Sequence, residues 1–266
     1  MEHVVAFSGG KDSTALLLWM REQARPYTAV FCDTGWEHPL TYAYIEEINR
    51  TVLDGQLVTV RSTAYADMED LVMRKGRVPS MRARFCTQEL KVKPMIAWLQ
   101  ARPDEVTLYQ GIRAEESPSR ATLPMRQYDD GYDCWIERPL LHWTAAQCFE
   151  ILHRHGIAEN PLYRMGAGRV GCFPCILVNH GDLKRMTLTM PEVWDRIVTL
   201  EQRAGRSFFY PKFIPARFHT GWDPKSGKSF PTAMDVRQYL AQATDAELAR
   251  YGGSAPACMS VYNLCE

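Results

Sequence analysis

A short turn near the N-terminus combines the residue types that bind phosphate groups. It reads Ser8-Gly9-Gly10-Lys11-Asp12-Ser13 and lies between an apolar run and a helical pattern. Glycines allow backbone N–H groups to approach an anion, and the N-terminal end of the following helix carries a partial positive charge. Lys11 adds a cation, both serines add hydroxyl groups, and Asp12 suits a metal-bound water or a helix cap. We predict a phosphate site here, although its spacing matches neither the Walker A nor the dinucleotide-binding glycine motif.

A second chemical feature is the C-x-x-C pair formed by Cys172 and Cys175. Soft thiolates bind iron–sulfur clusters or zinc, and such pairs also form redox-active dithiols. His180 follows Cys175 by five residues and would be a further ligand for zinc. Among the eight cysteines of the chain, Cys32 and Cys148 lie in apolar, element-like segments, where we expect them to be packed. The C-x-x-C pair is therefore the candidate for metal or redox chemistry.

The elements that would position these residues alternate between strands and helices. Apolar runs predict strands at residues 4–7, 28–31, 57–60 and 106–109, and helical patterns separate them. This alternation predicts βαβ units and a doubly wound, Rossmann-like parallel sheet of the α/β class. Ligands of such sheets bind at the carboxyl ends of the strands. The turn after Phe7 and the turn after Cys32 are therefore the expected ligand site.

Composition limits the kind of protein that this chain can be. Its 266 residues are 46% hydrophobic and 23% charged, with 31 Lys and Arg against 31 Asp and Glu. This composition is ordinary for a globular protein, and the zero net charge argues against a general coat for nucleic acid. No apolar run reaches the ~20 residues that a membrane span needs, and the first residues lack a signal-peptide pattern. We expect a soluble, cytoplasmic protein with no membrane partner.

Several ordered motifs resemble one superfamily. The turn at 8–13 is similar to the pyrophosphate loop (PP-loop) of the ATP pyrophosphatases, the adenine nucleotide alpha-hydrolase superfamily. Other segments are similar to its phosphoadenylyl-sulfate (PAPS) reductase-like branch: DTGWEHPLTY (33–42), GIRAEES (111–117) with Arg120, PLLHW (139–143), NPLY (160–163) and RVGCFPC (169–175). The resemblance covers roughly residues 3–180 and implies a five-stranded parallel sheet of the PP-loop ATPase type.

The resemblance implies an enzyme that cleaves ATP to AMP and pyrophosphate, uses Mg²⁺ and adenylates a substrate. All six residues of the turn would bind the nucleotide, and three would be catalytic: Lys11, Asp12 and Ser13. Three residues outside the turn would complete the nucleotide site: Asp33, Gly111 and Arg113. Three would bind the substrate: Arg113, Glu116 and Arg120. Without the resemblance, each arginine is also consistent with a surface salt bridge.

The chain departs from the sulfonucleotide reductases of this branch in three places. Those reductases usually carry an altered glycine loop, whereas the complete turn here favours ATP with magnesium. They end in a Glu-Cys-Gly-type tail, whereas this chain ends in Leu264-Cys265-Glu266, where Cys265 remains an alternative nucleophile. Where the iron–sulfur reductases have a Cys-Cys pair, this chain has Cys86-Thr87. A single cysteine at this place is similar to the sulfurtransferase of DNA phosphorothioation systems.

By this resemblance Cys86 joins Cys172 and Cys175 in a three-thiolate metal site. Three ligands to a [4Fe–4S] cluster would leave one iron open to hold sulfide, which a sulfur-transfer enzyme needs. The alternatives are zinc with His180 and a metal-free dithiol. Cys134 and Cys258 are further candidates, should the site have a fourth thiolate.

The C-terminal part has a different pattern. We divide the chain into a PP-loop nucleotide-binding core with the cysteine site, residues 1–190, and a helical, aromatic and basic segment, residues 191–266. Helices are expected at 191–203 and 235–250. Between them, residues 203–230 contain six Lys and Arg and one acid, and interleaved with these are Phe208, Phe209, Tyr210, Phe213 and Phe218. This combination is typical of a site for single-stranded nucleic acid, whereas the alternative is that the aromatic rings pack onto the core.

Three functions therefore compete. The first is an ATP-dependent, iron–sulfur sulfurtransferase that acts on a nucleic acid or a nucleotide, with a sulfur-donor protein as a candidate partner. The second is a PAPS or adenylyl-sulfate reductase, which releases sulfite. The third is a non-catalytic nucleotide-binding module. The intact Lys11, Asp12 and Ser13 favour an enzyme over the third.

Overall fold

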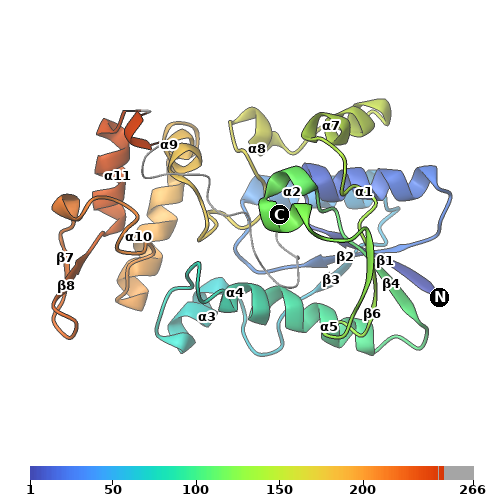
Figure 1. The fold of residues 1–266 in the computed structure, drawn as a ribbon, viewed down its shortest axis with the longest axis horizontal. Helices are drawn as coiled ribbons and strands as arrows, with labels where there is room; N and C mark the ends of the chain where they lie inside the picture. Colours follow the sequence, from blue (N-terminus) through green and yellow to red (C-terminus); the bar gives the residue numbers. More distant parts are fainter. Residues whose placement is uncertain (245, 249–266) are drawn as a thin grey trace.

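A six-stranded, mostly parallel sheet forms the centre of the protein in the computed structural model, which describes residues 1–244 and 246–248. The strand order is β3-β2-β1-β4-β6-β5 (Figure 1). The strands are β1 (Glu2–Phe7), β2 (Thr28–Cys32), β3 (Val58–Val60), β4 (Val106–Tyr109), β5 (Arg126–Asp129) and β6 (Cys134–Glu137). The four strands predicted from apolar runs are confirmed, as are the α/β class and the parallel pairing of β1 with β2 and β4.

Five strands of the sheet are parallel, as predicted, and a sixth strand that was not predicted runs antiparallel at the edge. β5 pairs with β6 from Arg126 opposite Glu137 to Asp129 opposite Cys134. β5 reads Arg-Gln-Tyr-Asp, and none of its residues is buried. An edge strand with one solvated face needs no apolar run, so this strand carries no hydrophobic signal in the sequence.

Helices cover both faces of the sheet, as a doubly wound fold requires. α1, α2 and α7 lie on one side of the sheet and α5 lies on the other (Figure 1). Adjacent side chains of a strand point to opposite faces, so Val5 packs with the first group and Val4 packs with α5. The helices of this part are α1 (Lys11–Glu22), α2 (Pro39–Thr51), α3 (Met68–Lys75), α4 (Phe85–Thr87), the π-helix η1 (Gln88–Val92), α5 (Lys93–Gln100), the 3-10 helix η2 (Ala114–Glu116), α6 (Pro118–Ala121), α7 (Ala145–Arg154) and α8 (Pro161–Arg164).

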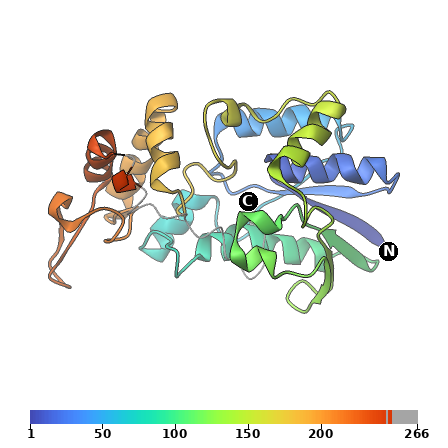
Figure 2. The same cartoon turned by 45° about the horizontal axis from the view of Figure 1, so that its top comes forward.

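The C-terminal elements lie at the end of the molecule opposite the N-terminus in both ribbon views (Figures 1 and 2). They are α9 (His180–Thr189), α10 (Glu192–Ala204), the 3-10 helix η3 (Ala216–Phe218), the hairpin of β7 (Gly221–Asp223) and β8 (Lys228–Phe230), and α11 (Ala233–Gln242). The helix predicted at 191–203 is confirmed as α10. The one predicted at 235–250 ends earlier, with α11, and residues 245, 249 and 250 lie outside the described part. The hairpin was not predicted.

One apolar cluster crosses the predicted boundary at residue 190. Trp36, Leu71 and Leu90 share it with Trp194 and Ile197 of α10. The C-terminal helices are thus packed on the segment that follows β2 and on α3. The division of the chain at this residue stays a prediction.

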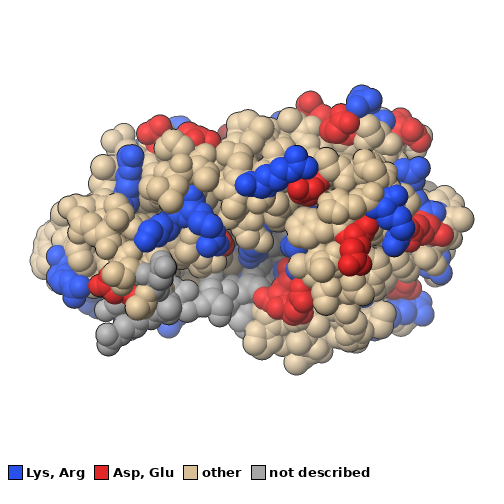
Figure 3. Space-filling view, turned by 90° about the horizontal axis from the view of Figure 1, so that it is seen from above, with Lys and Arg blue, Asp and Glu red and all other residues tan. Residues whose placement is uncertain are grey.

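The surface matches the balanced composition. Seen from above, Lys and Arg side chains are interspersed with Asp and Glu (Figure 3). None of the helices within residues 1–244 and 246–248 combines the length and the apolar character that crossing a lipid bilayer would require.

Candidate nucleotide and cysteine site

The predicted phosphate turn joins β1 to α1 and is held by its own side chains. Ser8 N–H donates to Ser13 Oγ at 3.2 Å, and Ser13 Oγ donates to the Gly10 carbonyl at 3.1 Å. Gly9 has a φ of +78°, and a Cβ there would lie 2.9 Å from Cγ1 of Ile45. Only glycine fits this left-handed, closely packed position. The turn is therefore followed directly by α1, whose N-terminal end is Lys11.

A buried ionic cluster forms around the first turn of α1. Lys11 Nζ lies 2.9 Å from Asp12 Oδ2, and Arg113 Nε lies 2.6 Å from Asp12 Oδ1. Burial by itself would raise the pKa of Asp12, but the charges of Lys11 and Arg113 outweigh it and lower this pKa. Burial disfavours the charged form of Arg113, yet the nearby Asp12 raises the pKa of Arg113. The structure thus brings Arg113 to the adjacent pair Lys11 and Asp12, from which it lies about a hundred residues away in the sequence.

Gly111 explains how closely β4 approaches this cluster. A Cβ at Gly111 would lie 2.9 Å from both the carbonyl carbon and the carbonyl oxygen of Asp12. It would also lie 3.1 Å from Ser13 N. The segment after β4 therefore packs backbone against backbone on the phosphate turn, which only glycine permits.

Asn160 and Tyr163 support the turn from α8, a contact that the sequence analysis missed. Asn160 Nδ2 donates to the Gly9 carbonyl at 3.1 Å, and Lys11 N–H donates to Tyr163 Oη at 2.9 Å. The Lys11 ammonium lies 5.5 Å from the centre of the Tyr163 ring. The only sequence signal was the motif at 160–163, to which no role had been assigned.

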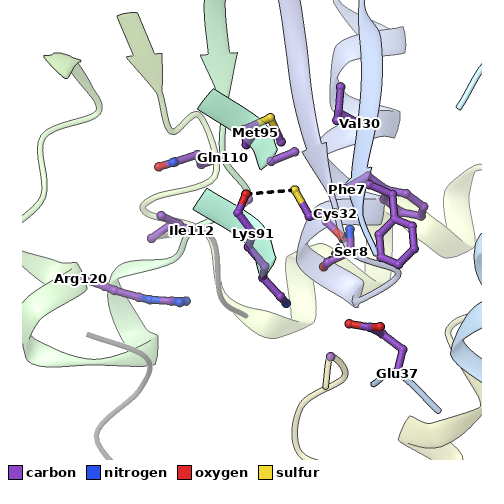
Figure 4. A pocket seen from close by; sticks show the side chains of 15 residues that line it. Phe7, Ser8, Val30, Cys32, Glu37, Lys91, Met95, Gln110, Ile112 and Arg120 are labelled. Carbon is purple, nitrogen blue, oxygen red and sulfur yellow. Dashed lines mark hydrogen bonds between the residues drawn. The ribbon is translucent and has the colours of Figure 1, made fainter. Parts of the chain in front are cut away.

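A pocket opens at the carboxyl ends of β1, β2 and β4, and we call it the strand-end pocket (Figure 4). Its lining includes Ser8, Ser13, Glu37, Lys91, Gly111 and Arg120. In Figure 4 the charged ends of Glu37, Lys91 and Arg120 point toward a common space, and Cys32 Sγ lies 3.5 Å from the Lys91 carbonyl. Arg120 is 1% exposed and Lys91 9%. Two buried cations, Lys91 and Arg120, beside a phosphate turn fit an anionic ligand.

The remaining predicted residues occupy two different surroundings. Glu116 accepts a hydrogen bond from Arg113 N–H at 2.8 Å and forms an ion pair with Arg120. Asp33 lines a separate pocket, where it accepts from Tyr42 Oη at 2.7 Å and from Arg61 Nε at 2.9 Å. In this structure the Asp33 carboxylate accepts its hydrogen bonds from protein side chains. Its contact with a nucleotide therefore stays a prediction.

The three predicted cysteine ligands line one pocket. Cys86, Cys172 and Cys175 border this cysteine pocket together with Arg84 and Lys91. Lys91 lines both pockets, so the cysteine pocket adjoins the strand-end pocket. Lys91 sits in the π-helix η1, a rare element that is frequent at functional sites. The sequence analysis assigned no role to Lys91.

The surroundings of the three thiols bear on the choice among an iron–sulfur cluster, zinc with His180 and a metal-free dithiol. No group of three or more His, Cys, Asp or Glu in the described residues is gathered closely enough to hold a metal ion. His180 does not line the cysteine pocket, and its Nε2 lies 2.5 Å from the Phe213 carbonyl, so a zinc site with His180 is not supported. Cys134 is buried in β6, and burial raises its pKa to about 11. Cys258 and Cys265 lie outside the described residues.

Comparison with known proteins identifies the family. The sequence profile of the phosphoadenosine phosphosulfate reductase domain matches residues 2–178. The chain belongs to this family. It is 32% identical to an uncharacterised 37.8 kDa protein of Escherichia phage 186, over 99% of this chain and 96% of that protein. It is 29% identical to an adenosine 5'-phosphosulfate reductase of Allochromatium vinosum, over 65% of this chain and 67% of that enzyme.

The solved structures agree on the fold of this PAPS reductase domain. A PAPS reductase from Candida auris, solved as a phosphate complex, aligns with a TM-score of 0.53 at 16% identity. The alignment covers 66% of this chain and 83% of that one. The expected adenine nucleotide alpha-hydrolase-like fold is thus confirmed, whereas membership of the phosphorothioation branch stays a prediction.

Arg196 of α10 ties the cysteine loop of the PAPS reductase domain to the loop after β2. Its guanidinium group donates to the carbonyls of Gly35, Glu37 and Phe173 at 3.1, 3.0 and 3.0 Å. The same group lies 3.8 Å from the centre of the Trp36 ring. Burial lowers the pKa of Arg196. A residue beyond the matched part of the chain therefore holds both loops of the site in register.

The aromatic residues expected to stack on bases pack mostly inward. Phe208, Phe209 and Phe213 are 5%, 5% and 4% exposed and belong to the core shared with Trp194. Phe213 stacks on His180, with 4.2 Å between the ring centres. Base stacking by these three rings is therefore excluded, and the alternative of core packing is correct for them.

Proposed function

We propose that this chain is an ATP-dependent enzyme that forms AMP and pyrophosphate and transfers sulfur to a nucleic acid or a nucleotide. The observation that carries the proposal is the adjacency of the two pockets through Lys91. A nucleotide held by the turn at 8–13 would lie in the strand-end pocket, next to the three thiols. Activation by ATP and delivery of sulfur would then take place at neighbouring points.

The phosphate turn would bind the leaving pyrophosphate. Lys11 and Arg113 are buried cations that already face the N-terminal end of α1, so they would stabilise negative charge without reorganising. Asp12 holds both cations in place. Mg²⁺ usually keeps several of its waters, and Asp12 is the residue that would hold Mg²⁺ through such a water, to neutralise further phosphate charge.

The substrate would enter between the two pockets. Adenylation turns an oxygen of the acceptor into part of AMP, a good leaving group, and sulfide then displaces AMP. Lys91 and Arg120 are placed to bind the phosphate that joins the acceptor to adenosine. Glu116 would orient Arg120 through their ion pair.

Cys86, Cys172 and Cys175 are the residues that would hold a [4Fe–4S] cluster, which binds sulfide at an iron without a protein ligand. The donor set fits because three soft thiols border one pocket. The Leu177 N–H donates to Cys175 Sγ at 3.4 Å, a contact that orients this sulfur. The thiolates that bind a cluster of several irons lie farther apart than those that bind one ion. This is compatible with the finding that no group of side chains in the described residues could hold a single metal ion.

A reductase is the second candidate, favoured by relatives named adenosine 5'-phosphosulfate and phosphoadenosine 5'-phosphosulfate reductases. Such an enzyme would release sulfite from a sulfonucleotide with a thiol reductant. It would need no pyrophosphate-forming step.

The experiment that tests the proposal measures two properties of anaerobically purified protein. These are its iron and sulfide content, and pyrophosphate release from ATP and Mg²⁺. Lys11→Ala should abolish pyrophosphate release and keep the iron, with Lys225→Ala, an exposed lysine beyond β7, as the control. Cys86→Ser should lose iron, with Cys134→Ala as the control.

Two results would contradict the proposal. Pyrophosphate release at the parent rate by Lys11→Ala would exclude the phosphate turn as the ATP site. A parent protein that releases sulfite from a sulfonucleotide but no pyrophosphate from ATP would establish the reductase instead.

A further inference from the structure

We propose that an exposed basic strip beside the cysteine pocket docks a single-stranded nucleic acid. The basic strip consists of Arg74, Lys75, Arg77, Arg82 and Arg84. These five cations lie within residues 71–88, which contain no Asp or Glu. The inference rests on the proposed function for the class of acceptor, and it assigns that acceptor a surface different from residues 203–230.

The strip is accessible and only partly neutralised. Residues 73–77, 81 and 82 are exposed. Arg74 Nη1 lies 3.5 Å from Asp70 Oδ2, and Lys75 Nζ lies 3.5 Å from Glu89 Oε1. Within residues 1–244 and 246–248, neither Arg77 nor Arg82 forms an ion pair with an acidic side chain. Two full positive charges therefore remain to bind an anion from outside.

The strip leads to the thiols. Arg84 lines the cysteine pocket beside Cys86. The guanidinium group of Arg77 lies 5.1 Å from the centre of the ring of Phe85, the residue before Cys86. α3 and α4, which bound the strip, lie on the side of the sheet opposite α7 (Figure 1). A chain bound along the strip would therefore pass the entrance to the cysteine pocket.

The side chains fit a single-stranded nucleic acid better than an acidic protein. Four of the five cations are arginines, whose planar groups bind phosphate in a bidentate manner and also stack on bases. Met73 and Met81, which are 40% and 39% exposed, offer apolar contact beside them. A single strand also presents unpaired bases, which can enter a buried site such as the cysteine pocket. In a duplex the bases stay paired and stacked.

The chain offers a matched control at its other end. Lys225 and Lys228 are exposed and flank the turn of the β7–β8 hairpin, in the stretch that the sequence analysis assigned to nucleic acid. The double substitutions R77S/R82S and K225S/K228S remove equal charge. Any loss of binding caused by net charge alone would therefore be the same in both variants.

The experiment measures fluorescence anisotropy of a labelled 20-nucleotide DNA or RNA strand with the full-length chain between 50 and 200 mM salt. Each phosphate contact on a single strand contributes about 0.7 to the slope of log K against log salt. R77S/R82S should therefore lower this slope by about 1.4 and weaken binding about 25-fold at 0.1 M salt. K225S/K228S should bind as the parent does, and thermal melts should show that both variants are folded.

Three outcomes would overturn the proposal. One is equal weakening in both variants, and another is parent-like binding by R77S/R82S. The third is a parent that binds poly-glutamate through Arg77 and Arg82 but neither oligonucleotide, which would make the strip a surface for an acidic protein. Pyrophosphate release is measured separately, without an oligonucleotide. Its absence from a protein that binds the strands through the strip would refute the proposed function and leave the docking surface intact.

Discussion

Replacing Gly111 with alanine tests the close contact on which the phosphate turn depends. The added Cβ would lie 2.9 Å from the Asp12 carbonyl group, whereas ordinary van der Waals contact begins at 3.4 Å. The backbone must therefore shift by about half an ångström, because a main-chain carbonyl in α1 cannot rotate away as a side chain does. Overpacking of this kind costs about 1–3 kcal/mol of unfolding free energy. In a protein of this size each kcal/mol lowers the melting temperature by about 2–4 °C.

The same shift should weaken the proposed reaction. The contact falls on Asp12 and Ser13 in the first turn of α1, and Asp12 forms the ion pairs with Lys11 and Arg113. Displacement of reacting groups by about 1 Å costs about 100-fold in rate, so half that displacement should cost about 10-fold. We expect kcat/KM for pyrophosphate formation to fall by about this factor in G111A.

The assay compares melting temperature and ATP kinetics of G111A with those of G181A. Gly181 is the second residue of α9, and a Cβ there would lie 3.4 Å from Asn179 Oδ1, an ordinary contact. Alanine is a better helix former than glycine by about 1 kcal/mol, so G181A should be as stable as the parent or slightly more stable. If G111A melts with the parent and keeps its kcat/KM, the argument from close packing is refuted.

Three further changes have defined outcomes. The hydrogen bond from Arg164 holds the pKa of Glu159 at about 2, below its ordinary 4.5, so Glu159→Gln should lower the melting temperature at pH 7, and the difference should disappear as pH falls from 4.5 to 2. Phe213→Ala removes a buried ring stacked on His180 and should cost about 3–5 kcal/mol in urea unfolding, without weakening oligonucleotide binding by the folded fraction. Arg196→Met leaves three carbonyl groups without their donor and should cost about 1.5–3 kcal/mol by the same measurement.

A different result would contradict each of these three predictions. A pH-independent difference for Glu159→Gln would remove the ion pair with Arg164 as its cause. Parent-like stability of Phe213→Ala would place the ring outside the core. Parent-like stability of Arg196→Met would show that other donors hold the two loops.

Local patterns in the sequence determined the elements and the chemistry of the phosphate turn. A strand buried on both faces needs a continuous apolar run, so β1, β2 and β4 were visible without any tertiary information. The edge strand β3 was visible through its β-branched residues, which favour strands. The turn at 8–13 was visible for a similar reason, because its glycines and its position before a helix are properties of neighbouring residues. The cysteine pair at 172 and 175 was equally local.

Only the tertiary structure decided which distant residues meet. Arg113 reaches Asp12 because β1 and β4 are neighbours in the sheet, an order that no local pattern encodes. Asn160 and Tyr163 support the turn because α8 packs beside it, and Lys91 joins the two pockets because a π-helix follows Cys86. Pairings of this kind depend on the path of the whole chain.

Burial was the other property that required the fold. The stretch 203–230 and the basic strip at 74–84 both contain cations and apolar side chains, so composition favours neither as a binding surface. The structure separates them, because Phe208, Phe209 and Phe213 are covered by α10 and its neighbours whereas Arg77 and Arg82 stay exposed. A side chain's type sets how it interacts, but the packing of distant segments sets whether it meets solvent.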